Sequence, residues 1–534
     1  MIMKKYTTIL AVIAAALVGT TSCLKDLEIE PVDDDVVLPA DILTGTEEFE
    51  KVLAKCYVGL STSGSWGESS ADIDGIDNGF GQYIRALYYL EEVPSDEAHL
   101  VWNDNTLPTF KFMRWTASDV FVRAMFSRCY FQISICNELI RQANASTLKD
   151  DPKIQQYVAE ARALRLLSYY HAVDMFGYKH IPFATEENNI GSVGPAPSND
   201  LVPWMLNEAE ELLSSDKLAA IGAAEYGRVD KGFVQMLKAK INLNAPVYLG
   251  LSGAEAAPYY QAAAEACKAI VAAYPTLHPN YKELFMSDND RCRDEIIFCV
   301  EEKAGEIQTW GSTQFLVCAQ YADGDTETAA LLGTSANGWG GLNVTPTFMN
   351  KFDRDNDVRF MFWGGPKGFP DTMDNPHDFT TGWSSYKWTN MASTGAIYAG
   401  NGFIDTDFPL FRSADAYLML AECQLRGASN VTETEAKAAW NAVRRRAGLG
   451  EVTNYTLDEL LDERGRELYW ECHRRSDLIR FGKFTGDSYL WEWKGGEHSG
   501  TAVSDYLALF PIPAAETNSN SKLGQNPGYA GATE

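Results

Sequence analysis

The chain has 534 residues and a net charge of −28 at pH 7; 46% of its residues are hydrophobic and 22% are charged. This hydrophobic content can form a sizeable core, which excludes an intrinsically disordered chain. The acidic excess repels phosphate groups, so it excludes general nucleic-acid binding and docking on anionic lipid through a basic patch. The length allows about three or four domains, or one large body with elaborations.

Residues 1–22 are typical of an export signal peptide. Lys4 and Lys5 give it a positive start, and an apolar stretch runs from Ile9 to Val18. That stretch is too short to cross a bilayer, which needs about 20 residues. Small residues then precede Cys23 in a pattern that resembles the processing site of bacterial lipoproteins, where this cysteine carries the lipid. The alternative is an ordinary secretory signal without lipidation.

Helical periodicity recurs along much of the chain. One segment begins at Asp151 and Pro152 and ends at Gly177, which are residue types that favour helix ends. Residues 258–274 carry aromatic, small and aliphatic residues on one face before Pro275, an order that resembles the second helix of a tetratricopeptide repeat. Further helices are predicted over residues 120–143, 230–243, 414–426, 434–447 and 457–474.

Two long stretches, residues 61–110 and 287–404, are rich in glycine and polar residues and lack helical periodicity. Such long irregular segments are uncommon unless they are functional, and ligand sites concentrate on loops. We therefore predict that residues 23–534 form a single domain. In it, a helical body (about 40–286 and 405–534) supports two loop-rich regions that bear the ligand site.

No common catalytic or nucleotide-binding motif occurs: HExxH, GxSxG, GxGxxG and the phosphate-binding loop are all missing from the sequence. The seven histidines show no metal-ligand spacing, and no CxxC pair exists. With 73 acidic residues, a catalytic carboxylate pair can be neither found nor excluded by counting. The sequence therefore favours a binding protein, and a hydrolase is the less favoured alternative.

Several segments together resemble one protein family. They are Glu160–Tyr170, Gly227–Lys231, Arg464–Gly482, Pro511–Pro513 and Gln525–Tyr529. These segments are similar to characteristic segments of the SusD/RagB family of Bacteroidetes surface lipoproteins, and the resemblance covers nearly the whole chain.

The resemblance implies a mainly α fold, in which four tetratricopeptide-like helix pairs pack against a loop-rich elaboration that carries the ligand site. It also implies a non-enzymatic glycan receptor, held at the outer-membrane surface by lipid on Cys23, which delivers oligosaccharide to a SusC-like TonB-dependent transporter. Charged residues of the family segments are expected to form ion pairs between helices rather than to contact ligand. These are Arg162, Arg165, Glu467, Arg474, Arg475 and Asp477.

Further stretches are similar to the starch-binding founding member of that family, which implies an α-1,4-glucan ligand such as starch or maltooligosaccharide. Aromatic rings would stack on the CH groups of its sugar faces, and polar side chains would bind the hydroxyl groups. By the resemblance, Trp310 and Trp339 supply the rings, and Asp77, Arg85 and Asn105 supply the polar contacts. The alternatives are turn roles for Asp77 and Asn105 and a structural ion pair for Arg85.

The sequence departs from the starch-binding pattern at Leu100, which stands where that relative has a third stacking tryptophan. His99 precedes it and Trp102 follows it. Leucine stacks less well on a sugar than an aromatic ring does, so weaker affinity or a differently shaped glucan is expected. A non-starch glycan therefore stays open as an alternative ligand, and a surface glycan hydrolase as an alternative function.

A structural calcium ion is a further expectation from the resemblance. Asp290, Asp405 and Asp407 match acidic positions that bind calcium in the starch-binding relative, and carboxylate oxygens suit this ion. Calcium would fasten the loop-rich region to the helical body. The alternative is that all three are solvated acids.

Overall fold

The computed structural model describes residues 42–188, 191–198, 200–335, 337–363, 373–397 and 402–532. The chain from Phe49 to Glu534 forms one compact unit, and the residues up to Glu48 belong to a separate unit. The predicted signal peptide and Cys23 lie outside the described residues, so cleavage and lipidation stay predictions. In the part that is described, no helix is both long and apolar enough to cross a membrane.

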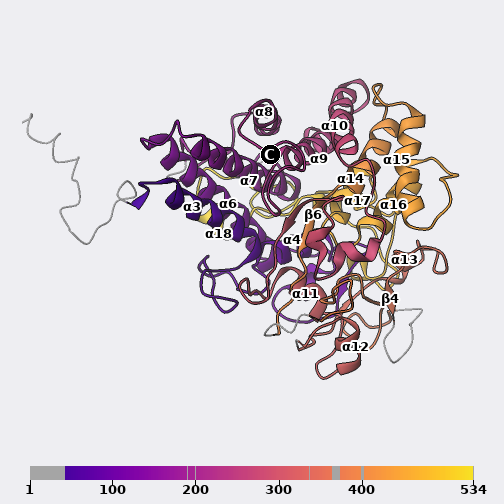
Figure 1. The fold of residues 1–534 in the computed structure, drawn as a ribbon. Coiled ribbons are helices and arrows are strands. Elements are labelled where there is room, and N and C mark those ends of the chain that lie inside the picture. The colour runs from indigo at the N-terminus through magenta and orange to yellow at the C-terminus, as the bar shows by residue number, and fades with distance from the viewer. Residues whose placement is uncertain are drawn as a thin grey trace, which may run out of the picture. The chain divides into compact units, whose positions relative to one another are not determined.

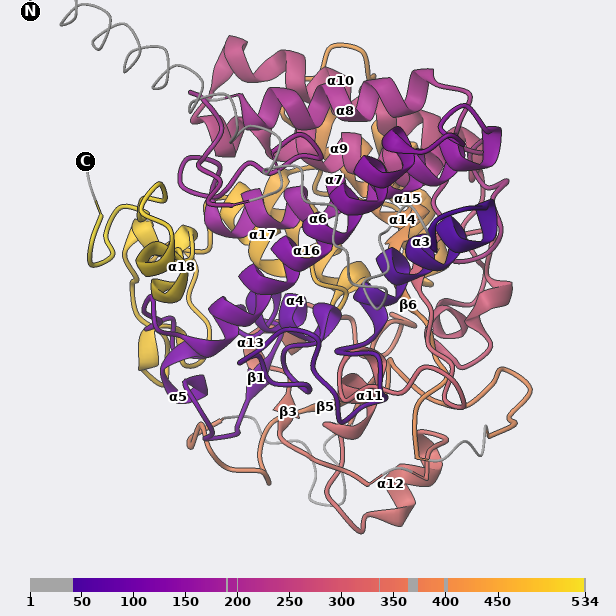
Figure 2. The same ribbon diagram turned by 90° about the vertical axis from the view of Figure 1, so that its left-hand side faces the viewer.

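Long helices dominate the unit from Phe49 onward, which confirms the predicted mainly α fold. Several of the helix pairs that pack on one another are neighbours along the chain: α6 (Val120–Ala145) on α7 (Pro152–Phe176), α8 (Leu201–Ser214) on α9 (Lys231–Leu249), α9 on α10 (Gly253–Ala273), and α14 (Ser413–Leu425) on α15 (Glu433–Arg446). Helix α10 also packs on α14, which is distant in the chain. Helices α8 to α10 lie at one end, and the loop-rich region with α11 (Ser312–Cys318) and α12 (Thr326–Leu331) lies at the other (Figures 1 and 2). This pairing is compatible with the tetratricopeptide-like arrangement, which stays a prediction.

Helix ends follow the local sequence closely in one case and not in another. Asp151 accepts a hydrogen bond from the backbone N–H of Lys153 at 2.8 Å, and Gly177 ends α7 with a φ of 70°, as predicted. The single helix predicted over residues 457–474 is wrong. It is divided into α16 (Leu457–Leu468) and α17 (Arg474–Arg480).

The division between α16 and α17 has a tertiary cause. Trp470 and Cys472 have φ values of 61° and 63°, which a helix does not allow. The backbone N–H and ring N–H of Trp470 both donate to Glu97, at 3.1 and 3.0 Å. Contacts made 373 residues away in the chain therefore override the helical pattern.

The loop-rich prediction for residues 61–110 is wrong in part, because this stretch contains α4 (Tyr83–Glu91). Helix α4 is only nine residues long and follows the glycine-rich segment with Gly75, Gly79 and Gly81, so the stretch is typical of a loop although every residue of the helix is buried. Residues 287–404 are mostly irregular, as expected, with short elements only. The remaining elements are α3 (Thr46–Ser61), β1 (His99–Leu100), α5 (Leu107–Phe110), η1 (Tyr281–Phe285), η2 (Asn289–Arg291), β2 (Ile296–Val300), α11 (Ser312–Cys318), α12 (Thr326–Leu331), β3 (Leu342–Asn343), α13 (Pro346–Met349), β4 (Phe362–Trp363), β5 (Ser384–Ser385), β6 (Phe408–Arg412), η4 (Lys494–Gly496), η5 (Asp505–Ala508) and α18 (Ala514–Ser519).

The ion pairs predicted for the family segments are confirmed. Almost all are buried and join segments far apart in the chain, so they fasten the helices to one another. The pairs are Arg162–Glu208 (2.6 Å), Arg165–Glu208 (2.8 Å), Glu467–Arg412 (3.0 Å), Arg474–Asp96 (2.7 Å), Arg475–Asp174 (3.0 Å) and Asp477–Arg464 (2.7 Å). With their charges satisfied inside the protein, these residues hold the fold rather than a ligand.

Candidate functional site

Three half-buried tryptophans meet at the loop-rich end of the molecule, and we call them the tryptophan cluster: Trp102, Trp310 and Trp339. The ring centres of Trp310 and Trp339 are 6.1 Å apart with an angle of 63° between their planes. Those of Trp102 and Trp339 are 6.5 Å apart at 55°. Phe403 packs against Trp310 at 5.0 Å. The structure therefore brings the two predicted rings together and adds a third.

A short antiparallel strand pair places Trp102 beside Trp339. Strand β1 pairs with β3 so that Leu100 lies opposite Leu342, and continuing this register places Trp102 opposite Gly340. The ring N–H of Trp102 donates to the backbone carbonyl oxygen of Gly340 at 2.9 Å. Gly341, with a φ of 89°, must be glycine, because a Cβ there would lie 2.6 Å from the Trp102 ring nitrogen.

The starts of helices α4 and α11 position Arg85 and Trp310. The side-chain oxygen of Gln82 accepts from the backbone N–H of Arg85 at 2.8 Å and from that of Ser312 at 3.1 Å, so it joins both helices. Arg85 then donates from Nη1 to the carbonyl oxygen of Trp310 at 2.7 Å. Its guanidinium carbon is 5.5 Å from the centre of the Trp339 ring, within cation–π range.

Among the described residues, Arg85 has no carboxylate partner within salt-bridge distance, and its side chain contacts the tryptophan cluster instead. The structural ion pair considered for Arg85 is therefore not seen in the described part of the chain. Its 8% exposure leaves little of it for direct contact with a ligand, so its clearest role is to hold the rings.

Asp77 lies in an exposed loop next to Arg85. Its Oδ1 accepts from the backbone N–H groups of Gly79 and Phe80 at 2.7 and 2.9 Å, which is a turn role. A Cβ built on Gly79 would lie only 3.3 Å from Arg85 Nη1, so this loop borders the cluster. The other oxygen of Asp77 has no partner among the described residues and can accept from a ligand hydroxyl.

Asn105 is exposed and also occupies a turn, with a φ of 49°. Its amide approaches the neighbouring Asp104 carboxylate at 3.4 Å. Burial raises the pKa of the Tyr89 hydroxyl, Arg85 lowers it, and the carboxylates of Asp104 and Asp77 raise it again. Both acidic loops thus lie near Tyr89 on α4, which brings Asn105 to the region of the cluster. Its contact with a glycan stays a prediction.

Leu100 cannot serve as a stacking surface, because it is fully buried in strand β1. Trp102, two residues later, supplies the third ring of the cluster. The sequence showed Trp102 as a tryptophan in a loop-rich region but gave no reason to assign it a role. Phe403 gave no signal at all, since a phenylalanine in a long loop cannot be told from a core residue.

The three acids predicted to bind calcium do not form a ligand set as they stand. Among the described residues, no group of three or more His, Cys, Asp or Glu side chains is arranged to hold a metal ion. The two oxygens of Asp407 accept from a backbone N–H at 2.8 Å and from the Tyr226 hydroxyl at 2.7 Å. Asp405 accepts from the backbone N–H of Ala304 at 3.0 Å. Calcium binding by Asp290, Asp405 and Asp407 therefore stays a prediction.

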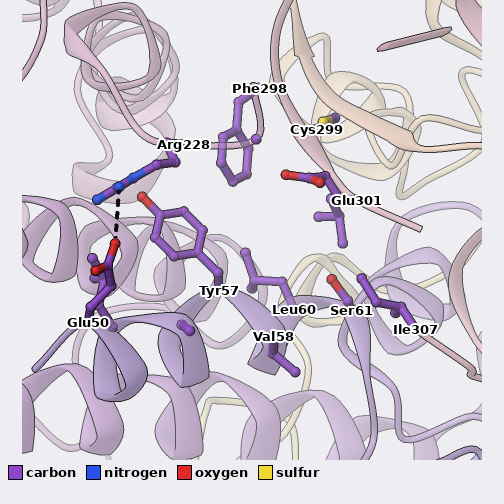
Figure 3. Close-up of a pocket in the computed structure, with 14 residues that line it drawn as sticks. Glu50, Tyr57, Val58, Leu60, Ser61, Arg228, Phe298, Cys299, Glu301 and Ile307 are labelled. Atoms are coloured by element: carbon purple, nitrogen blue, oxygen red, sulfur yellow. Dashed lines mark ion pairs between the residues drawn. The ribbon is translucent and has the colours of Figure 1, made fainter. Parts of the chain in front are cut away.

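A hollow of about 290 Å³ lies beside α3, and none of the predicted glycan-binding residues lines it (Figure 3). Leu53 and Phe298 contribute to its largely apolar lining. Arg228 and Glu50 form an ion pair at 4.0 Å on one side. Arg228 also donates to the buried Glu160 at 2.7 Å, so its charge is satisfied within the protein. No tryptophan is among the residues that line this hollow, and the lining is largely apolar, so the tryptophan cluster is the better candidate for a sugar site.

The chain is similar in sequence to several known proteins. The model of the SusD family matches residues 317–529. The starch-binding protein SusD of Bacteroides thetaiotaomicron is 31% identical over 97% of this chain and 98% of its own length. The chain belongs to the SusD family. The SusD-like protein P2 of Formosa agariphila is 23% identical over 99% of this chain and 100% of its own length.

Solved structures of SusD-like proteins share the fold. Surface glycan-binding protein A from Bacteroides thetaiotaomicron, in complex with laminarihexaose, matches with a TM-score of 0.68 and 19% identity, over 90% of this chain and 99% of that one. A SusD superfamily protein from Parabacteroides distasonis also has a TM-score of 0.68, with 20% identity over 91% of this chain and 100% of that one. SusD family proteins bind glycans and are associated with the Bacteroidetes cell surface.

Proposed function

We propose that the protein is a non-enzymatic receptor that captures starch or maltooligosaccharide at the cell surface. The observation that carries the proposal is the tryptophan cluster. It consists of three half-buried rings, and Arg85 donates a hydrogen bond to the backbone of one of them, Trp310. The 31% identity to a starch-binding protein over nearly the whole chain supports the same ligand class.

The geometry of the cluster suits an α-glucan chain. The Trp310–Trp339 and Trp102–Trp339 ring planes are inclined at 63° and 55°, so the rings form a curved rather than a flat surface. Starch curls into a helix whose sugar faces expose CH groups, and a curved set of rings can stack on successive sugars. Asp77, with one free carboxylate oxygen beside the cluster, can bind hydroxyl groups at the edge of the chain.

Affinity electrophoresis in gels that contain amylopectin tests the proposal. The wild-type protein should be retarded, and Trp339→Ala should migrate as it does in a gel without polysaccharide. Val358→Ala, which removes an exposed apolar side chain outside the cluster, is the control and should be retarded like the wild type. Steady release of reducing sugar from starch above a boiled control would instead indicate a hydrolase.

A second candidate ligand follows from one structural likeness and one departure. A neighbour with a TM-score of 0.68 was solved with laminarihexaose, and Leu100 is buried where the starch-binding pattern has a ring. Parallel gels with laminarin separate the two ligands. Retardation in laminarin but not in amylopectin would replace the α-glucan assignment and leave the receptor role intact.

We further infer that lipid on Cys23 anchors the protein to the outer membrane, where it delivers bound glycan to a SusC-like TonB-dependent transporter. The signal sequence and family membership support this location and partner. Replacement of the lipidated residue, Cys23→Ser, should move the protein from the membrane fraction to the soluble fraction, because the acyl chains provide the anchoring. Co-purification of the transporter with the wild-type protein tests the partnership.

A further inference from the structure

A second hollow lies next to the tryptophan cluster, at helix α12. Its volume is about 510 Å³, within the range of small-molecule sites in proteins. Helix α12 lies beyond α11 at the loop-rich end of the molecule (Figures 1 and 2). The hollow is lined by polar groups that can bind hydroxyls and by small apolar groups, among them Asp323, Thr326, Ala330, Ser335, Asn337 and Ile397.

The backbone of Gly340 connects this hollow with the cluster. A Cβ built on Gly340 would lie 3.5 Å from the ring of Phe379, and 3.7 Å from the carbonyl oxygen of Tyr321, which lines the hollow. Gly340 directly follows Trp339, and its own carbonyl oxygen is held by Trp102. Phe379 and the rim of the hollow therefore meet within one residue of the cluster.

Phe379 is 56% exposed although hydrogen bonds hold the backbone of its loop. The Asp378 carboxylate accepts from the backbone N–H of Thr380 at 2.8 Å, and Asn343 of strand β3 donates to the carbonyl oxygen of Thr381 at 2.9 Å. An exposed aromatic ring on a loop with hydrogen-bonded backbone loses less conformational freedom on stacking than a ring on an unconstrained loop.

A buried lysine fixes this loop relative to the cluster. Lys111 is 4% exposed, and its Nζ donates to the carbonyl oxygens of Leu100, Trp102 and Pro376 at 3.1, 3.3 and 3.0 Å. The Lys111 ammonium group thus connects strand β1, the backbone of Trp102 and the loop that carries Phe379. Burying a lysine is costly, so this arrangement indicates that the relative position of these segments matters.

We propose that Phe379 and the hollow at α12 form a second glycan subsite, continuous with the tryptophan cluster. The inference rests on the proposed glycan-binding function and extends it. Phe379 stacks on a sugar beyond those that the cluster covers, and the polar lining binds the hydroxyl groups of that sugar. The expected ligand is a neutral sugar, because the carboxylates of Asp323 and Asp325 at the hollow repel anions.

Calorimetry with maltotriose and maltoheptaose tests the subsite. Phe379→Ala and Ala330→Arg, which fills the hollow, should weaken maltoheptaose binding about three- to tenfold and leave maltotriose binding unchanged. Leu331→Arg is the matched control, because it adds the same group to the same helix at a position that does not line the hollow. If laminarin proves to be the ligand, the corresponding laminari-oligosaccharides are used.

The outcomes separate the subsite from the proposed function. Loss of binding at both chain lengths in Trp339→Ala supports the tryptophan cluster as the main site, whatever the two subsite variants do. Equal weakening of both oligosaccharides by Phe379→Ala, or no weakening of either, would overturn the second subsite. If Phe379→Ala no longer co-purifies with the transporter but binds glycan with wild-type affinity, Phe379 belongs to a protein interface. That result would also overturn the second subsite.

Discussion

Arg85 donates from Nη1 to the backbone carbonyl oxygen of Trp310 at 2.7 Å, and this bond joins helix α4 to the segment that enters α11. The two residues are 225 positions apart in the chain. The same guanidinium lies 4.5 Å from the centre of the Phe315 ring, within α11. Arg85 therefore fixes both the backbone and the surroundings of a ring in the tryptophan cluster.

We predict that Arg85→Ala weakens glycan binding although Arg85 is largely buried. A hydrogen bond from a charged donor contributes about 1.5–3 kcal/mol, and its loss would free the Trp310 backbone. Calorimetry with maltoheptaose should show a decrease in affinity of about ten- to a hundredfold. Arg85→Lys, which keeps the positive charge but not the planar guanidinium group, should recover part of the lost affinity. Wild-type affinity in Arg85→Ala would show that the bond does not position the ring.

Trp102 makes two separable contributions, and two substitutions distinguish them. Trp102→Phe keeps a ring but removes the N–H that binds Gly340, whereas Trp102→Ala removes both. Aromatic stacking contributes about 0.5–1.5 kcal/mol beyond area burial, so Trp102→Ala should reduce affinity about two- to tenfold more than Trp102→Phe does. Equal affinities of both variants and the wild type would exclude Trp102 from the glycan site.

The sequence could predict the mainly α fold and the helix ends that depend on local residues, such as Asp151 and Gly177. It missed α4, because this helix is only nine residues long and follows a glycine-rich segment that is typical of a loop. It also missed the break after α16, since the cause is a distant contact from Trp470 to Glu97. Local residues thus determine some helix ends, such as those of α7, and long-range contacts determine others, such as the end of α16.

In the candidate site, too, some residues could be predicted from the sequence and others depended on long-range contacts. Trp310 and Trp339 could be named from resemblance, and the structure brings them together. The third ring depended on the register of β1 and β3, which buries Leu100 and brings Trp102 to Gly340. Strand pairs of two residues carry too little pattern for the sequence to reveal such a register.

Calcium should stabilise the protein if Asp290, Asp405 and Asp407 rearrange to bind it. Binding to the folded state alone adds about 2.7 kcal/mol of unfolding free energy at a concentration of 100 Kd. The Tm at pH 7.5 should therefore be higher in calcium than in EDTA. Asp405→Asn should lose this difference, and Glu306→Gln, an exposed acid in the same region, should keep it. The same Tm for the wild type in both buffers would exclude the calcium site.

Glu91 should make the fold less stable as the pH rises above about 5. Burial, together with the neighbouring Asp174 carboxylate, raises the pKa of Glu91 to about 8, against 4.5 in an ordinary environment. Between these values the folded state holds a proton that the unfolded state releases, so stability falls with rising pH by up to about 1.4 kcal/mol per pH unit.

Urea unfolding at pH 5 and pH 8 measures this effect in the wild type and in Glu91→Gln. The glutamine keeps an oxygen that can accept from Ser476 without a charge to bury, and its amide group replaces the oxygen that accepts from Arg475 at 3.3 Å. The free energy of unfolding should therefore fall less between the two pH values in Glu91→Gln than in the wild type. Glu187→Gln, which changes an exposed acid, should behave like the wild type. A fall of equal size in all three proteins would show that Glu91 is not the group that titrates.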